Sequence, residues 1–192
     1  MLYYVSPQLW AWRKGRVRTM AKFVDRIAVL LPFEEEIYKR VNIPCEFVGH
    51  PVMEEIEEYE KNTRASGRHP ASELRTPVIA LLPGSRPNEM KTLLPVFIEL
   101  VKVLKSQLPD CRFMLPLAPN IEAGRFDAYL NMLKDEGVVL VKGETIKTLA
   151  SSDAAVIASG TATFQAALLG IPTVVVYKLS WLSYLTAKAV ID

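Results

Sequence analysis

A short turn after an apolar segment carries the first residues that could do chemistry. The segment Val78–Leu82 (VIALL) reads as a buried strand, and Gly84, Ser85 and Arg86 follow it. Glycine lets backbone N–H groups approach an oxyanion, serine can donate a hydrogen bond, and arginine can bind two oxygens. This order of residue types indicates a phosphate or diphosphate site. An ordinary strand-to-helix turn with its arginine in water has the same pattern, so the motif alone leaves both interpretations open.

A second group of polar residues follows the apolar segment 154–158 (AAVIA). Ser159, Gly160 and Thr161 end a strand and open a helix, so they offer hydroxyls, free N–H groups and a positive dipole end. Helix capping by the two hydroxyls is the alternative, and it needs no ligand. Gln165, one turn into the helix, could bond a ribose hydroxyl or lie on an exposed face. Together the two turns could hold the two phosphates of one nucleotide sugar.

Other polar residues near expected strand ends are less informative. His50 follows the last strand of the first half, where it could bond substrate, although a lone histidine is more often structural. Glu144 and Thr145 follow another strand and could frame a base or form a plain loop. Cys45 and Cys111 fit no disulfide pattern, so we expect buried thiols and a reducing compartment. No metal is expected, because no cluster has ligand spacing.

Composition bounds the class of protein. The chain has 192 residues, half of them hydrophobic, and a formal net charge of +2, so it can bury a core but gives no sign of binding nucleic acid. No signal peptide is visible at the start. Residues 10–22 (WAWRKGRVRTMAK) carry basic side chains and no acidic one. This stretch could lie against anionic lipid or a phosphorylated substrate, or it could be a solvated basic helix face packed by its aromatic residues.

Apolar runs alternate with helical patterns along the chain, which predicts parallel sheets with right-handed crossovers. We expect strands at residues 2–6, 26–31, 45–49, 78–82, 111–116, 138–141, 154–159 and 173–177. We expect helices at 16–24, 34–42, from Pro95 to 107, at 126–137, 145–152, 161–170 and from 180 to 192.

This pattern predicts an α/β fold with two Rossmann-like units. Residues 1–53 would form a partial first unit, residues 54–77 an acidic and polar linker, and residues 78–192 a second unit. The chain opens directly into a strand and stops inside an expected helix. We therefore expect the first unit to be incomplete and the second to be truncated.

Five segments, taken in order, resemble the bacterial lipid-A-disaccharide synthase family over essentially the whole chain. They are VSPQLWAWRKGRV, LPFEEEIY, EFVGHP, LLPGSRPNEM and ASGTATFQAALLGIPTVVVY. The combination is specific, although PGSR or SGTAT alone would not be. The resemblance implies an inverting glycosyltransferase with two Rossmann-like domains (the GT-B type). Such an enzyme transfers 2,3-diacylglucosamine from UDP-2,3-diacylglucosamine to 2,3-diacylglucosamine 1-phosphate, giving lipid A disaccharide 1-phosphate and UDP.

The resemblance also implies a setting and a set of partners. Members of the family work in lipid A (lipopolysaccharide) biosynthesis in Gram-negative bacteria. They are peripheral on the cytoplasmic face of the inner membrane, with no required metal or other cofactor. A homodimer is possible for the intact protein.

Site residues follow from the resemblance as expectations. Arg86 would stabilise the diphosphate leaving group, and His50 would line the cleft between the domains. The remaining substrate-binding residues would be Gly84, Ser85, Ser159, Gly160, Thr161, Thr163 and Gln165. The family commonly has a glutamate at the position of Gln165, so nucleotide affinity is expected to differ. The general base is expected to lie outside this chain.

Two alternatives remain open at this stage. Another UDP-sugar enzyme of the GT-B type, such as a GlcNAc transferase or a UDP-GlcNAc 2-epimerase, would use the same two turns. The chain alone could also be an inactive fragment that at most binds UDP, because the expected general base is missing.

Overall fold

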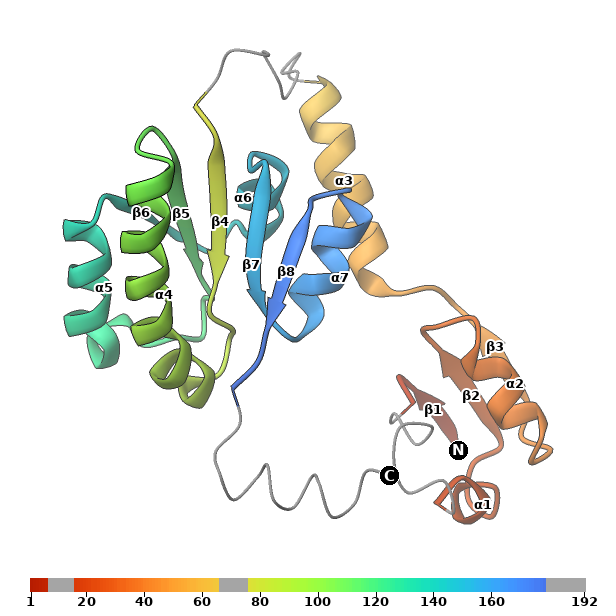
Figure 1. Cartoon of the computed structure of the whole chain (residues 1–192). Helices are drawn as coiled ribbons and strands as arrows, with labels where there is room; N and C mark the ends of the chain where they lie inside the picture. The colour runs from red at the N-terminus through yellow and green to blue at the C-terminus, as the bar shows by residue number, and fades with distance from the viewer. Residues whose placement is uncertain (7–15, 66–75, 179–192) are drawn as a thin grey trace. The chain divides into compact units, whose positions relative to one another are not determined.

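The computed structural model describes residues 1–6, 16–65 and 76–178, which form two compact units (Figure 1). The first unit runs to Glu54 and the second begins at Glu55. Each unit contains one parallel β-sheet, so the predicted α/β class with two Rossmann-like units is confirmed.

The first unit is a three-stranded sheet with the order β1-β2-β3. Its elements are β1 (Leu2–Tyr4), α1 (Arg16–Met20), β2 (Arg26–Val29), α2 (Glu34–Lys39) and β3 (Cys45–Phe47). Ile27 and Val29 of the central strand are fully buried, and Val17 of α1 and Tyr38 of α2 pack with them. Burial raises the pKa of the Tyr38 phenol above its usual value.

The second unit is a five-stranded sheet with the order β6-β5-β4-β7-β8, and all its strand pairs are parallel. Its strands are β4 (Val78–Leu82), β5 (Arg112–Leu117), β6 (Val138–Lys142), β7 (Ala154–Ala158) and β8 (Thr173–Val176). Its helices are α4 (Pro87–Gln107), the short 3₁₀ helix η1 (Ala123–Phe126), α5 (Asp127–Asp135), α6 (Thr145–Ala150) and α7 (Thr161–Leu168).

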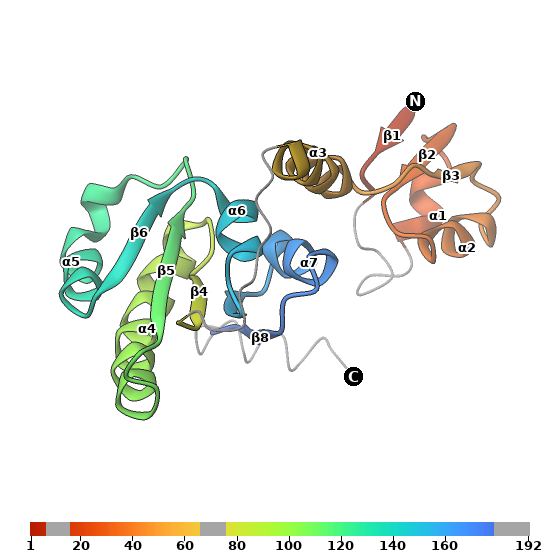
Figure 2. The same cartoon turned by 90° about the horizontal axis from the view of Figure 1, so that it is seen from above.

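Helices cover both faces of this sheet, as Figure 2 shows from above. On one face, α4 and α5 pack on Leu81, Phe113 and Leu115. On the other face, α6 and α7 pack on a smaller set that includes Leu82 and Ile157. Because successive strand residues point to opposite faces, β4 contributes Leu81 to one core and Leu82 to the other. Such a two-sided strand must be continuously apolar, which is why VIALL was recognisable.

The strand order reverses its direction between β4 and β7, and this place is the topological switch point of the sheet. The helix that follows β4 covers one face of the sheet, whereas the helix that follows the adjacent strand β7 covers the other face. The two strand-to-helix turns therefore diverge and leave a crevice between the carboxyl ends of β4 and β7. In open parallel sheets, this crevice is where ligands bind.

The acidic segment expected to be linker is in large part a helix. Helix α3 spans Pro51–Ala65, so residues 54–65 of the expected linker are helical. Val52 and Ile56, four residues apart, are buried, and an ion pair joins Glu57 to Lys61 one turn later. This apolar spacing in VMEEI, residues 52–56, is the helix signal that the sequence prediction missed. Residues 66–75 of the expected linker lie outside the described part of the chain.

Helix α4 also begins earlier than predicted. Pro95 was expected in its first turn, but the helix starts at Pro87 and Pro95 lies in its interior. Proline in a helix interior loses one hydrogen bond and costs roughly 3 kcal/mol in free energy. Six buried side chains along this helix offset that cost, among them Leu94 and Phe97 on either side of the proline. Tertiary packing thus overrides the local preference.

Three further features bear on the sequence expectations. Gly137 and Gly170, the last residues of two expected helices, instead follow α5 and α7 with φ of +77° and +69°, the left-handed conformation typical of a residue after a helix end. Cys45 and Cys111 are free, Cys111 is buried, and burial raises the pKa of both thiols. The helix expected at 180–192 lies outside the described residues. Within the described ranges, no helix is long and apolar enough to cross a membrane.

Candidate functional site

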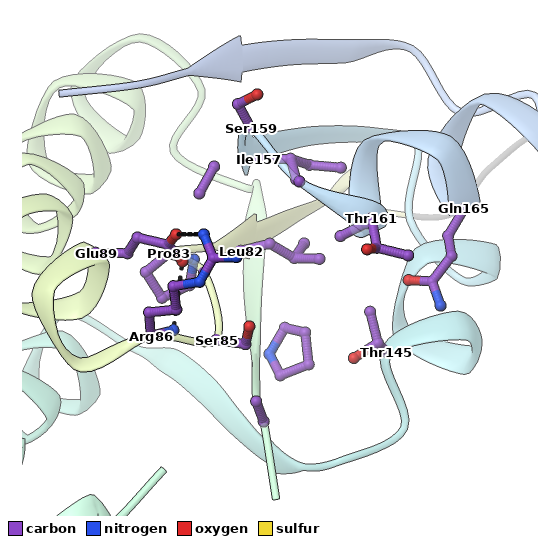
Figure 3. A pocket seen from close by; sticks show the side chains of 16 residues that line it. Leu82, Pro83, Ser85, Arg86, Glu89, Thr145, Ile157, Ser159, Thr161 and Gln165 are labelled. Atoms are coloured by element: carbon purple, nitrogen blue, oxygen red, sulfur yellow. Dashed lines mark hydrogen bonds and ion pairs between the residues drawn. The ribbon is translucent and has the colours of Figure 1, made fainter. Parts of the chain in front are cut away.

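A cavity of about 260 Å³ lies in the second unit at the carboxyl ends of β4 and β7, as the switch point requires (Figure 3). The turns after these two strands supply most of its walls, and Pro116 and Ala118 of the β5 end and Thr145 of α6 complete it. Its volume is near the lower end of the range for small-molecule sites, roughly 300–1,000 Å³. It therefore suits a group the size of a diphosphate.

The turn after β4 brings a cation to the cavity. Gly84 has φ of +101°, a conformation that side chains with a Cβ rarely adopt, and this bends the chain sharply after Pro83. Arg86 then has an extended backbone just before α4, and its guanidinium is largely exposed, with 78% of the side-chain area accessible. Among the described lining residues, Arg86 is the single cation and Glu89 the single acid.

Two side chains hold this turn in place. The Glu89 carboxylate accepts a hydrogen bond from the Arg86 backbone N–H at 3.3 Å and another from its guanidinium Nη1 at 3.0 Å. The Asn120 amide, from the segment after β5, donates to the Ser85 carbonyl at 3.0 Å. The backbone of the turn is thereby fixed from both sides.

The turn after β7 contributes a helix N-terminus. Ser159, Gly160 and Thr161 line the cavity, and α7 begins at Thr161. The first N–H groups of a helix have no acceptor within the helix, and the helix dipole adds partial positive charge at the same end. The Ser159 N–H already donates to the Val176 carbonyl of β8, so Ser159 offers only its hydroxyl.

The far side of the cavity from Arg86 is polar but uncharged. Figure 3 shows Thr145, Thr161 and Gln165 gathered there, opposite Arg86 and Glu89. The Gln165 amide nitrogen donates to the Glu55 carboxylate of α3 at 3.3 Å. A group with hydroxyls would find both donors and acceptors on this side.

The structure brings most of the predicted residues together. Those that line the cavity are Gly84, Ser85, Arg86, Ser159, Gly160, Thr161 and Gln165. Thr163 does not line it, because its hydroxyl donates back to the Gly160 carbonyl at 2.7 Å inside the first turn of α7. His50 belongs to the first unit, where its Nδ1 accepts the Val52 N–H at 3.2 Å at the start of α3.

Sequence reasoning missed two residues of the site. Glu89 stands three positions after Arg86, a spacing that matches the capping-box signature at a helix start, and this could have flagged it. Asn120 follows the strand β5 in the sequence LAPN, and nothing local points to its bond with Ser85.

The arrangement is that of an anion site. One guanidinium, a glycine-containing turn and a helix N-terminus converge on one small cavity, and each of these groups favours negatively charged oxygen. Among the described residues, no three His, Cys, Asp or Glu side chains are grouped so as to hold a metal ion.

Comparisons with known proteins all find similarity to the same family. The family model described as Lipid-A-disaccharide synthetase matches residues 1–192. Proteins named lipid-A-disaccharide synthase from Syntrophus aciditrophicus (strain SB) and Anaeromyxobacter sp. (strain K) are 41% and 43% identical over the whole chain. One from Coxiella burnetii (strain CbuK_Q154) is 37% identical over the whole chain. The chain spans about half the length of these relatives, between 49% and 50%.

Proposed function

Because the chain belongs to the lipid-A-disaccharide synthetase family, we propose that the cavity in its second unit binds the UDP part of an acylated sugar donor. The protein would transfer 2,3-diacylglucosamine from UDP-2,3-diacylglucosamine to 2,3-diacylglucosamine 1-phosphate, with lipid A disaccharide 1-phosphate and UDP as products. The observation that carries the proposal is the convergence of the β4 and β7 turns on one cavity, in which Arg86 is the one cation among the described lining residues.

In this proposal Arg86 acts on the leaving group. As the acceptor hydroxyl attacks the anomeric carbon and gives up its proton to a base that is not assigned to this chain, the bond from that carbon to the diphosphate oxygen breaks and negative charge grows on UDP. A guanidinium beside this oxygen stabilises the charge more in the transition state than in the ground state. The N-terminus of α7, at Gly160 and Thr161, would receive the other phosphate. Neither a metal nor another cofactor has a role in the proposed step.

The proposal also covers the acceptor, the membrane and the quaternary structure. The substrates carry acyl chains, so we propose a peripheral position at the cytoplasmic face of the inner membrane. We assign no general base within this chain, and His50 stays a proposed contact to substrate from the first unit. A homodimer is proposed for the intact protein only.

The first experiment compares donors. UDP-2,3-diacylglucosamine and unacylated UDP-GlcNAc are each incubated with 2,3-diacylglucosamine 1-phosphate, and both UDP and disaccharide are measured. We expect product from the acylated donor only. Turnover of UDP-GlcNAc instead would mean a different UDP-sugar enzyme. UDP binding without any turnover by the chain would mean that the chain alone is a binding fragment.

The role of Arg86 is tested by Arg86→Ala in a form of the protein that turns over donor. We expect UDP release to fall by about 100-fold or more, as when one donor to a developing oxyanion is removed. Arg112→Ala is the matched control, because Arg112 is an exposed arginine at the opposite, amino end of the neighbouring strand β5. An Arg86→Ala rate close to that of the unsubstituted protein would contradict the assignment.

A further inference from the structure

Glu89 is an acidic residue in a cavity whose other features favour anions. Its side chain lines the cavity and is only 17% exposed, whereas the Arg86 side chain that it contacts is 78% exposed. A carboxylate at this place repels a bound phosphate by charge alone. We therefore expect Glu89 to have a role that offsets its repulsion of a bound phosphate.

The two carboxylate oxygens of Glu89 each accept a hydrogen bond from Arg86. Oε2 accepts the Arg86 backbone N–H at 3.3 Å, and Oε1 accepts guanidinium Nη1 at 3.0 Å, as the dashed lines of Figure 3 show. One carboxylate thus holds both the backbone and the far end of Arg86. Because Glu89 engages only Nη1, other guanidinium N–H groups remain for a ligand, and these include a pair suited to bidentate phosphate binding.

The turn is built around this carboxylate. A Cβ placed on Gly84 would overlap Glu89 Oε2 and would lie 2.9 Å from the Glu89 Cβ. Glycine is therefore required at position 84 for two reasons: the backbone φ is +101°, and the Glu89 side chain approaches too closely to leave room for a Cβ. An ordinary surface pair on the same helix looks different: Lys102 and Glu99 are also three residues apart and 3.0 Å from each other, but the Glu99 side chain is 72% exposed.

We propose that Glu89 is a positioning residue that presents the Arg86 guanidinium to the diphosphate. The proposal rests on the proposed function, because it takes the anion in the cavity to be the diphosphate of UDP. Without Glu89, the long Arg86 side chain would sample many rotamers in water, and binding would have to order it. With Glu89, this ordering is already present before the ligand arrives.

The test is UDP binding by the chain, measured by calorimetry, for Glu89→Gln, Arg86→Ala and the double variant. Glutamine has nearly the same shape but a single acceptor oxygen, so it can keep one of the two bonds to Arg86 at most. We expect Glu89→Gln to weaken UDP binding about tenfold. In the Arg86→Ala background the same change should have no further effect, because the group it positions is absent.

Controls separate positioning from a structural role. Glu99→Gln, the matched change on the exposed pair, should leave UDP affinity unchanged. Uridine lacks phosphates, so its affinity should not respond to Glu89→Gln. Glu89→Asp keeps the charge but loses the reach of one methylene, so we expect it to weaken UDP binding as well. Thermal unfolding of each variant shows whether the fold is retained.

Each contrary outcome has a distinct meaning. If Glu89→Gln binds UDP as tightly as the unsubstituted chain or more tightly, repulsion outweighs positioning and the inference fails. If its loss is equally large in the Arg86→Ala background, Glu89 acts only as a helix cap and the inference also fails. In both cases the proposed function stands, provided that Arg86→Ala is impaired. If the unsubstituted chain does not bind UDP, the proposed function fails and the inference fails with it.

Discussion

At the scale of single residues, the site depends on side chains that hold one another. Arg86 is exposed and would be mobile by itself, but Glu89 engages its backbone and its guanidinium. Gln165 on the other side of the cavity is held in the same way by Glu55. The sequence predicted only an uncharged residue where an acid was expected, whereas the structure shows the Glu55 carboxylate 3.3 Å from the Gln165 amide.

This pairing predicts how a carboxylate at position 165 behaves. Gln165→Glu would place two carboxylates at the distance now spanned by a hydrogen bond, and their repulsion would disturb this side of the cavity. Adding Glu55→Gln restores an amide and a carboxylate in exchanged places. We expect the double variant to bind UDP about 3- to 5-fold more tightly than Gln165→Glu alone, which corresponds to ~0.7–1 kcal/mol.

Calorimetric titration with UDP measures this difference directly. Glu58→Gln serves as the control in the Gln165→Glu background, because Glu58 is an exposed glutamate on the same helix α3. Equal affinities for the single and double variants would show that Glu55 and Gln165 do not interact in solution.

At the scale of helices and strands, the alternation of elements was predictable because parallel strands buried on both faces have to be apolar throughout. VIALL and AAVIA were recognised on that basis, and the polar residues after them line the cavity. The start of α4 was not predictable in the same way. Pro95 marks a helix start by local preference, and only the buried stripe on both sides of it shows that the helix continues.

The site itself was predictable only in part, for a related reason. Residues that follow strands could be assigned to the cavity because strand ends of a parallel sheet share an edge. The position of Thr163 outside the cavity lining could not be predicted from sequence, because its return bond to the Gly160 carbonyl depends on the local helix geometry. Glu89 resembled a surface ion pair, because its contact with the turn at Gly84 exists only in the folded chain.

The helix α2 carries a prediction about pH. Burial raises the pKa of Tyr38, so the folded first unit binds the phenol proton more tightly than the unfolded chain does. The stabilisation is fully present below the unfolded pKa of about 10 and is lost as pH rises through the folded pKa. We expect the free energy of unfolding of this unit to fall by up to about 1.4 kcal/mol per pH unit above pH 10 on account of Tyr38.

Urea unfolding between pH 9 and 11.5 measures this slope. Tyr38→Phe has no titrating phenol, so its slope should be shallower than that of the unsubstituted chain, while the other tyrosines and lysines contribute equally to both. Identical slopes for the two proteins would show that Tyr38 does not titrate differently on folding.

At the scale of the whole molecule, all the described residues that line the cavity belong to the second unit, and one of them is a cation. The first unit contributes the separate candidate His50. The proposed transfer therefore assigns UDP recognition to the second unit and leaves the acceptor to the rest of the protein. In the proposed transfer, Arg86 compensates the charge of the diphosphate and no metal ion takes part.

Because the proposal assigns charge compensation to Arg86, we expect the binding of UDP to be independent of divalent ions. We expect the dissociation constant to change by less than about twofold, or ~0.4 kcal/mol, when EDTA replaces Mg²⁺ in the titration. A large loss of affinity in EDTA would show that a metal ion bridges the diphosphate and the protein, and Arg86 would then have a lesser role.

The most direct test of the central claim is a crystal structure of the chain with UDP. The account predicts the diphosphate in the cavity between the β4 and β7 turns. Its oxygens should lie about 2.7–3.2 Å from the Arg86 guanidinium and from the N–H groups at the start of α7. A diphosphate bound elsewhere on the chain, or one that leaves Arg86 paired only with Glu89, would contradict it.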